Sequence, residues 1–402
     1  MAVRVRSIDL LRGADVLLML FVNEAASVQG APSFVKHAPA EADAMTAADV
    51  VFPAFLFIVG IAVPFALGGR LQRGEPRAAV WRHVLTRTAA LLAMGLFTVN
   101  AEYGDGGVLP TYFWNLLMGV GVLLVWGVGE EGWGRLKARW LRAGGVVLLV
   151  CLALAYRSHE ASGWLQLRPH WWGILGLIGW AYLAVATAYL LVGERPAALA
   201  GLVALLSGIA LADGMRALGP WAVRPLFGQY LGSHSAAALA GLLLGVLLRR
   251  HVREPAGTRA LVTRALLLAG GLAAAGLLLH ALGGGQPALR FSKIHATVPW
   301  ALLSAAITCV AWLVLFLLAD VAGWRRWPRS LTIAGENPLL AYLIAPMVLS
   351  LLALSAPWCG GTSPYDELAE SATLGIVRSL VFAWLTVRLC GFLRARGLRV
   401  QL

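Results

Sequence analysis

Apolar stretches long enough to cross a lipid bilayer recur along almost the whole of this sequence. A transmembrane α-helix needs about 20 predominantly apolar residues. With 59% hydrophobic and only 13% charged residues, the chain differs from soluble domains, in which about 25% of residues are charged. The sequence therefore predicts an all-α, polytopic transmembrane helix bundle. The expected spans are 10–28, 50–69, 83–101, 111–129, 143–158, 172–192, 196–212, 230–249, 260–282, 298–320, 331–355 and 371–392.

The stretch at 196–212 is short, so apolar length alone predicts either eleven or twelve spans. The distribution of charges decides between the two numbers. Cytoplasmic loops of membrane proteins carry an excess of Lys and Arg. With twelve spans, most of the 33 Lys and Arg residues fall on the side of the N-terminus; without 196–212, the basic segment 249–264 would move to the other side. We therefore expect about twelve helices, both termini cytoplasmic, and a single domain over 1–402 in a bacterial inner membrane.

The net charge of +13 does not indicate nucleic-acid binding, because the arginines lie in short loops between apolar runs. The four cysteines are far apart and form no CxxC pair, which argues against a disulfide framework. Several histidines fall near the expected outer face without a paired ligand motif such as HExxH. We expect no metal site and favour a proton-handling vestibule. These histidines are His37, His159, His170, His234, His280 and His295.

The N-terminal segment has a second interpretation. Three arginines, a short apolar run and the small residues Ala25-Ala26-Ser27 resemble a cleaved signal peptide. Asp15 lies inside the apolar run and argues against cleavage, so we expect this segment to stay in the protein as its first helix.

The first hairpin carries more polar residues than a membrane span tolerates without a function. Asp9 and Arg12 fall at the inner end of its first helix, Asn23 falls at the outer end, His37 in the outer loop, and Asp49 where the second helix opens. A structural interpretation exists for each: an i,i+3 ion pair, helix capping, and an exposed loop histidine.

Two later segments also mix polar and apolar residues. In the outer loop 283–297, Lys293 lies four residues before Thr297, so one helical turn would bring both to the same face. The span 331–355 opens with Gly335, Glu336, Asn337 and Pro338. These residues predict either a proline-kinked helix start or a polar patch that lines a channel.

The first hairpin resembles the heparan-α-glucosaminide N-acetyltransferase family. The matching residues are RSIDLLRG at 6–13, VN at 22–23, KHA at 36–38 and TAADVVFPAFLFIVG at 46–60. The segment WWGILGLIGWAY at 171–182 resembles the bacterial branch of that family, which is linked to N-acetylglucosamine utilisation.

The resemblance implies transfer of acetyl from cytosolic acetyl-CoA to the amine of glucosamine or a related amino sugar at the periplasmic side. It implies that His37 is the catalytic histidine, either as a general base or as a covalent acetyl carrier. Asp49 would orient His37, and Asn23 would stabilise the oxyanion. For acetyl-CoA, Arg12, Lys293 and Asn337 are the candidates, with Arg82 and Arg87 as further cations for its phosphates.

Two other functions share these features: a permease for N-acetylglucosamine or another sugar, and an O-acetyltransferase acting on a cell-envelope polymer. The polar residues gather at the outer mouth, whereas transporters bind near the membrane midplane, which favours the enzyme. The expected partners are the amino sugar, acetyl-CoA and the lipid bilayer, without nucleic acid. The sequence leaves a homodimer open.

Overall fold

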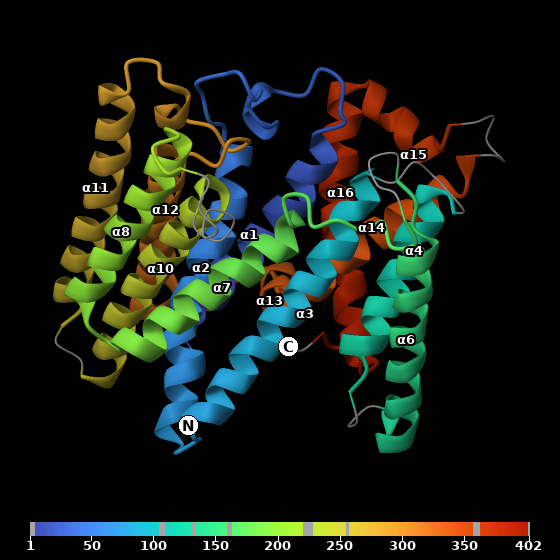
Figure 1. Cartoon of the computed structure of the whole chain (residues 1–402), viewed down its shortest axis with the longest axis horizontal. Coiled ribbons are helices and arrows are strands. Elements are labelled where there is room, and N and C mark those ends of the chain that lie inside the picture. The colour runs from blue at the N-terminus through green and yellow to red at the C-terminus, as the bar shows by residue number, and fades with distance from the viewer. Residues whose placement is uncertain are drawn as a thin grey trace. The chain divides into compact units, whose positions relative to one another are not determined.

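A computed structural model describes residues 5–103, 109–129, 133–158, 163–219, 228–254, 257–356 and 362–400. Within this part of the chain, a helix occupies each of the twelve predicted apolar stretches, so the all-α fold is confirmed (Figure 1). His159 lies outside the described residues. The long helices are α1 (Arg6–Ala25), α2 (Ala47–Gln72), α3 (Arg77–Tyr103), α4 (Thr111–Val122), α6 (Arg135–Ala155), α7 (Gly173–Val192), α8 (Pro196–Gly214), α10 (Gln229–Arg253), α11 (Thr258–Leu282), α12 (Val298–Leu315), α14 (Pro338–Ala353) and α16 (Ala372–Ala395).

Nine helices in the described ranges are long and apolar enough to cross a membrane. The remaining three of the twelve predicted stretches do not form a single helix that is long and apolar enough to cross, each for a different reason. α1 carries charged residues such as Asp9, Arg12 and Asp15 along its length, and the apolar helix at 111–127 is short. The last stretch is broken at Asn337, where α13 (Arg329–Glu336) and α14 meet at 98°. Counted as one span, this bent pair gives a tenth crossing.

The helices form two compact units. The first unit comprises residues 1–15, 32–88 and 177–327, and the second comprises 16–31, 89–176 and 328–402. α1, α3 and α7 therefore contribute to both units. In the first unit, α10 is the central helix: it is buried along its whole span and contacts α2, α8, α11 and α12 (Figure 1).

Glycines set the close packing of α2 on α10. A Cβ atom on Gly241 would collide with the backbone carbonyl of Phe57, and one on Gly245 with that of Ile61. Gly241 and Gly245 form a GxxxG pair, a pattern that allows helix backbones to approach closely in membranes. Both contacts keep the same register, so α2 and α10 run parallel.

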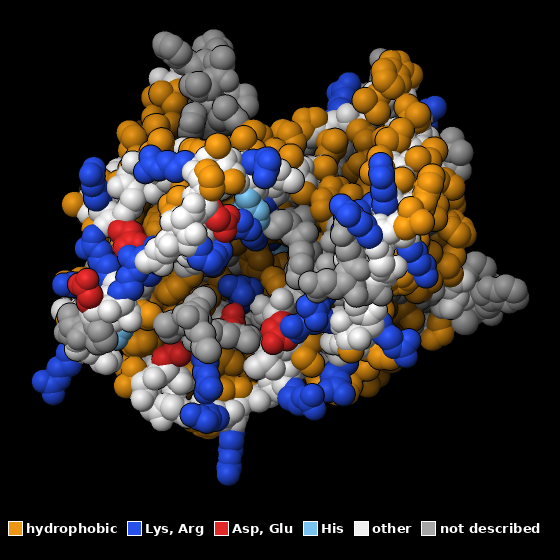
Figure 2. All heavy atoms as spheres, turned by 90° about the horizontal axis from the view of Figure 1, so that it is seen from below, with side chains coloured by type: hydrophobic (Ala, Val, Ile, Leu, Met, Phe, Trp, Pro, Cys, Tyr) orange, Lys and Arg blue, Asp and Glu red, His pale blue; other side chains and the backbone are white. Residues whose placement is uncertain are grey.

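The two ends of the first unit carry different groups. The loops 32–46 and 283–297 lie at one end, where α2 and α12 begin. At the other end, Arg70 pairs with Glu75 over 2.8 Å, and the buried Arg249 bonds the hydroxyl of Tyr189 over 2.6 Å. Figure 2 views the molecule from below, and Lys and Arg side chains outnumber acidic ones on the face that it shows.

In the second unit, α4 packs against α6 and α14, and α16 packs against α13 and α14. Asn337 explains the break before α14, because its side chain accepts the backbone N–H of Leu340 and so caps the new helix. Pro338 follows at the first helical position, where the missing N–H costs nothing.

Candidate functional site

His37 and Asp49 are directly bonded in the first unit. His37 lies in the loop between α1 and α2, and Asp49 lies in the first turn of α2. The Nδ1 atom of His37 is 2.8 Å from Oδ1 of Asp49. The Asp49 side chain is fully buried, whereas that of His37 is 29% exposed. The His37 ring is therefore bonded to a buried carboxylate through Nδ1, while part of the side chain is accessible to solvent.

The backbone around Asp49 fixes its carboxylate. Oδ2 accepts the backbone N–H of Thr46 at 2.9 Å and that of Ala38 at 3.1 Å. The indole N–H of Trp300 in α12 donates to the backbone carbonyl of Asp49 over 2.9 Å. Asp49 thus has two roles: it caps the N-terminus of α2 and it binds the imidazole.

These contacts determine which nitrogen of His37 is available. A carboxylate accepts hydrogen bonds, so the neutral imidazole that bonds Asp49 carries its proton on Nδ1. The lone pair of Nε2 then points away from Asp49. An aspartate that holds a histidine in this tautomer is the arrangement by which triad enzymes prepare a base.

Lys293 reaches the same nitrogen from a distant segment. Its Nζ lies 2.8 Å from Nε2 of His37. The loop 283–297 is tied to the loop of His37, because Phe291 donates its N–H to Asp43 over 2.9 Å and accepts that of Ala44 over 3.1 Å. Burial lowers the pKa of Lys293 to about 8, although the nearby charge of Asp49 acts in the opposite direction. The amine is therefore partly neutral near pH 8.

The expected helical turn from Lys293 to Thr297 does not form. Ala296 adopts a positive φ of 49°, and α12 begins only at Val298. The hydroxyl of Thr297 donates to the carbonyl of Arg290 over 2.7 Å instead of sharing a face with Lys293. Thr297 therefore stabilises the loop that presents Lys293.

A second histidine lies close to this cluster. His234 in α10 is buried, with its ring edge-on to Phe52 at 5.2 Å and to Trp300 at 5.7 Å between centroids. Its Nδ1 has no hydrogen-bond partner among the described residues. The sequence placed His234 among the outer histidines, but it gave no sign that the ring would pack beside the tryptophan that holds Asp49.

The other candidates occupy separate places. In the first unit, Arg12 Nη1 lies 3.3 Å from Asp9 Oδ1. In the second unit, Asn23 is exposed in the last turn of α1, and Asn337 is buried as the cap of α14. The structure thus brings together His37, Asp49 and Lys293.

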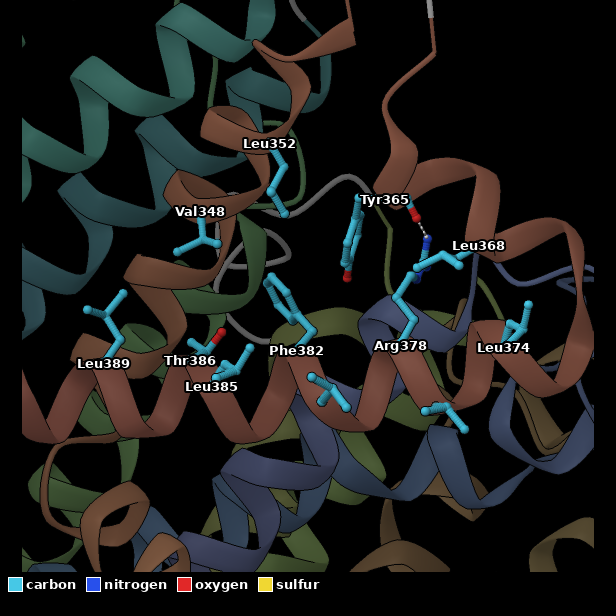
Figure 3. A pocket seen from close by; sticks show the side chains of 12 residues that line it. Val348, Leu352, Tyr365, Leu368, Leu374, Arg378, Phe382, Leu385, Thr386 and Leu389 are labelled. Atoms are coloured by element: carbon cyan, nitrogen blue, oxygen red, sulfur yellow. Dashed lines mark hydrogen bonds between the residues drawn. The ribbon is translucent and has the colours of Figure 1, made fainter. Parts of the chain in front are cut away.

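Sequence reasoning missed a buried ionic cluster in the second unit. Glu24 accepts a hydrogen bond from the hydroxyl of Tyr365 and lies 3.9 Å from Arg378 of α16. The Arg378 guanidinium stacks on the Tyr365 ring at 4.4 Å (Figure 3). An acidic residue at the end of one apolar run and an arginine inside another were the available signals, since buried charges in membranes are usually paired.

Comparison with known proteins adds a family assignment. Residues 5–357 match the model of an acyltransferase domain. Curated relatives include the heparan-alpha-glucosaminide N-acetyltransferases of Homo sapiens and Mus musculus, which are 35% and 33% identical over 100 residues. Those 100 residues are 25% of this chain and only 14% of each relative, so the match covers a small part of the relatives' length.

Proposed function

Because the chain belongs to the acyltransferase domain family that its residues 5–357 match, we propose that it is a transmembrane N-acetyltransferase. In this proposal it moves acetyl from cytosolic acetyl-CoA to the amine of glucosamine or a related amino sugar at the periplasmic side. The observation that carries the proposal is the bonded pair of His37 and Asp49, which leaves Nε2 of an accessible imidazole as a base.

The chemistry requires such a base. A sugar ammonium has no lone pair, so it must lose a proton before its nitrogen attacks the thioester carbonyl. His37 accepts this proton on Nε2, and Asp49 stabilises the imidazolium that results. The new C–N bond replaces the C–S bond. The ammonium loses two protons in the course of the reaction: the proton held by His37 passes to the leaving thiolate, and the second, lost from nitrogen as the amide forms, is released to solvent.

The contact with Lys293 favours proton transfer over a covalent acetyl-histidine. Nζ is 2.8 Å from Nε2 and 3.4 Å from Nδ1, so the amine lies beside both ring nitrogens. An acetyl group on Nε2 would have to displace Lys293. When Lys293 is an ammonium, its positive charge beside Nε2 opposes protonation of that nitrogen; when it is neutral, Nε2 is able to accept a proton.

The remaining candidates complete the proposal. Asn23 stabilises the oxyanion that forms on the acetyl carbonyl, as a side-chain amide does in other acyl transfers. Arg12 and Asn337 contact acetyl-CoA, and Lys293 contacts the acetyl end of the same donor beside His37. Arg12 suits a phosphate because a guanidinium binds it through two parallel hydrogen bonds.

The test is transfer of labelled acetyl from acetyl-CoA by the purified protein to a panel of acceptors. Glucosamine should become N-acetylated, whereas N-acetylglucosamine, whose amine is already blocked, should not be labelled on nitrogen. Labelling of hydroxyls on a cell-envelope polymer alone would instead identify an O-acetyltransferase. Uptake of N-acetylglucosamine into proteoliposomes, with no transfer to any acceptor, would contradict the enzyme and favour a permease.

A further inference from the structure

Lys293 belongs to a turn, residues 290–297, that is closed by its own hydrogen bonds. The hydroxyl of Thr297 donates to the carbonyl of Arg290 over 2.7 Å and accepts the N–H of Ser292 over 3.1 Å. The N–H of Thr297 also donates to the carbonyl of Ser292 over 3.1 Å. Ser292 and Thr297 are both buried. The turn therefore keeps one shape, and the position of Lys293 depends on how this turn is attached to its neighbours.

The side chain of Asp43 attaches the turn to the loop that carries His37. Its Oδ1 atom accepts the backbone N–H of Phe291 over 2.9 Å. The next residue in the same loop, Ala44, donates its own N–H to the carbonyl of Phe291 over 3.1 Å. Both backbone polar groups of Phe291 are thus bonded to two consecutive residues of the His37 loop. Two bonds to one residue restrict the rotation of the turn that a single bond would allow.

His280, in the last turn of α11, approaches the Asp43 carboxylate from a third segment. Its Nδ1 lies 3.6 Å from Oδ1 of Asp43 and 3.3 Å from the carbonyl of Leu289. Its ring packs on that of Phe291, with 4.3 Å between the centroids. The Asp43 side chain is 38% exposed. A carboxylate with this exposure is ordinarily solvated, so its bond to a backbone N–H 248 positions away requires an explanation.

The explanation lies two residues after Phe291. Lys293 Nζ is 2.8 Å from Nε2 of His37, and burial there lowers the pKa of Lys293 to about 8. If the turn rotates away, the amine returns to water and its pKa rises toward the ordinary 10.5. The titratable groups around Lys293 are His37 in its loop, Asp49 in α2 and His234 in α10. The carboxylate whose charge acts on the amine is that of Asp49.

We propose that Asp43 is a positioning residue of the site: by holding the backbone of Phe291, it keeps Lys293 beside Nε2 of His37. The inference rests on the proposed function in taking His37 as the base, but the placement of Lys293 does not depend on which group is transferred. Asp43 acts as a hydrogen-bond acceptor and not through its charge. An asparagine at this position keeps an acceptor oxygen and should preserve the arrangement, whereas an alanine should lose it.

Competitive labelling of the purified full chain with trace acetic anhydride tests the proposal, because mass spectrometry of the peptide that contains Lys293 reports the titration of this amine. The wild type should show a midpoint of about 8. This measurement needs no variant, and a midpoint of 10.5 would overturn the proposal. Asp43→Ala should raise the midpoint by about one unit or more, whereas Asp43→Asn should keep the wild-type midpoint. Glu41→Ala, which removes an exposed carboxylate of the same loop, is the matched control and should also keep it.

The pH dependence of acetyl transfer is the second readout. The rise in rate through about pH 8 should be retained in Asp43→Asn and lost in Asp43→Ala. An unshifted Lys293 midpoint in Asp43→Ala that elutes as wild type would overturn the proposal, and so would equal shifts in Asp43→Ala and Asp43→Asn. A shifted midpoint with an unchanged rate profile would overturn the link to His37. Absence of transfer by the wild type would contradict the proposed function, while the labelling would still decide the role of Asp43.

Discussion

At the scale of single residues, Asp49 combines two functions that mutations can separate. Its carboxylate binds His37 and also accepts the backbone N–H of Thr46 at the start of α2. An amide keeps an acceptor oxygen for the cap, but it does not stabilise an imidazolium or enforce the tautomer. Different substitutions of Asp49 should therefore lower the activity and the stability of the protein to different extents.

Asp49→Asn should lower kcat by about 10²–10⁴-fold, the usual contribution of an oriented base. Asp49→Ala should lower kcat as much and also destabilise the protein by about 0.5–2 kcal/mol, because the helix cap is lost. Acetyl-transfer rates and thermal unfolding in detergent measure the two effects. Glu41→Gln, an exposed carboxylate in the same loop, is the control and should change neither. Near-normal kcat in Asp49→Asn would contradict the role assigned to this carboxylate.

Lys293 should shape the pH dependence of the reaction. Its pKa of about 8 means that it is mostly an ammonium below pH 8, when its charge beside Nε2 of His37 opposes protonation of that nitrogen, and increasingly neutral above it. The rate should therefore rise with pH through about 8. Lys293→Met removes this charge, so its profile should lack that rise. His37, Asp49 and His234 are the titratable groups around Lys293.

The comparison uses one acceptor for both proteins, so ionisation of the acceptor amine affects both profiles equally. Lys36→Met changes a lysine next to His37 in sequence and should keep the wild-type profile. Superimposable profiles of wild type and Lys293→Met would show that Lys293 does not control Nε2.

The sequence allowed His37 and Asp49 to be predicted as candidates, because they belong to one short motif whose order is visible in the chain. Their catalytic roles stay predictions. The approach of Lys293 to His37 was not predictable, since it depends on a contact between Asp43 and Phe291, which are 248 positions apart. The buried environment of His234 depends likewise on α2 and α12 packing around α10. Periodicity and spacing carry no information about such long-range contacts.

At the scale of helices, the close approach of α2 and α10 fixes the position of α2, whose first turn carries Asp49. Gly241 has no room for a Cβ because the obstacle is the backbone of Phe57, not a flexible side chain. Gly241→Ala should therefore destabilise the protein by about 1–3 kcal/mol, the usual cost of overpacking. Thermal unfolding in detergent measures the loss.

Gly208 in α8 is the matched control, because nothing lies within 4 Å of the Cβ that an alanine would add there. Alanine also favours a helix over glycine by about 1 kcal/mol. Gly208→Ala should therefore leave the unfolding temperature unchanged or raise it. If both variants unfold at the same temperature, the glycine contact does not limit the packing of α2 on α10.

The sequence predicted where the helices lie better than where they are interrupted. Apolar runs long enough to span are visible from composition alone, and each contains a helix. The 98° bend at Asn337 was foreseen only as a kink, because a proline is compatible with a straight helix start as well as with a break. The cap that Asn337 forms with Leu340 decides between a straight helix start and a break, and this cap is visible in the structure but not in the composition.

At the scale of the whole molecule, the proposal requires His37 to face the periplasm and the basic segment 249–264 to face the cytoplasm. In a cysteine-free background, Glu41→Cys should react with an impermeant maleimide on intact cells. Arg259→Cys should react only after the cells are permeabilised. Both positions are exposed, so failure to react reports the side of the membrane. Labelling of position 259 in intact cells would reverse the topology and remove the basis for transfer across the membrane.

The most direct test of the central claim is the rate of acetyl transfer from acetyl-CoA to glucosamine by His37→Ala. We expect a fall of about 10²–10⁴-fold, because a general base is lost. Stabilisation of the variant by acetyl-CoA in a thermal-shift assay should be retained, because donor binding does not depend on the base. His170→Asn is the control. Asparagine tolerates the positive φ that residue 170 adopts, so this variant should fold and its rate of acetyl transfer should be near normal. Near-normal turnover by a folded His37→Ala protein would contradict the account.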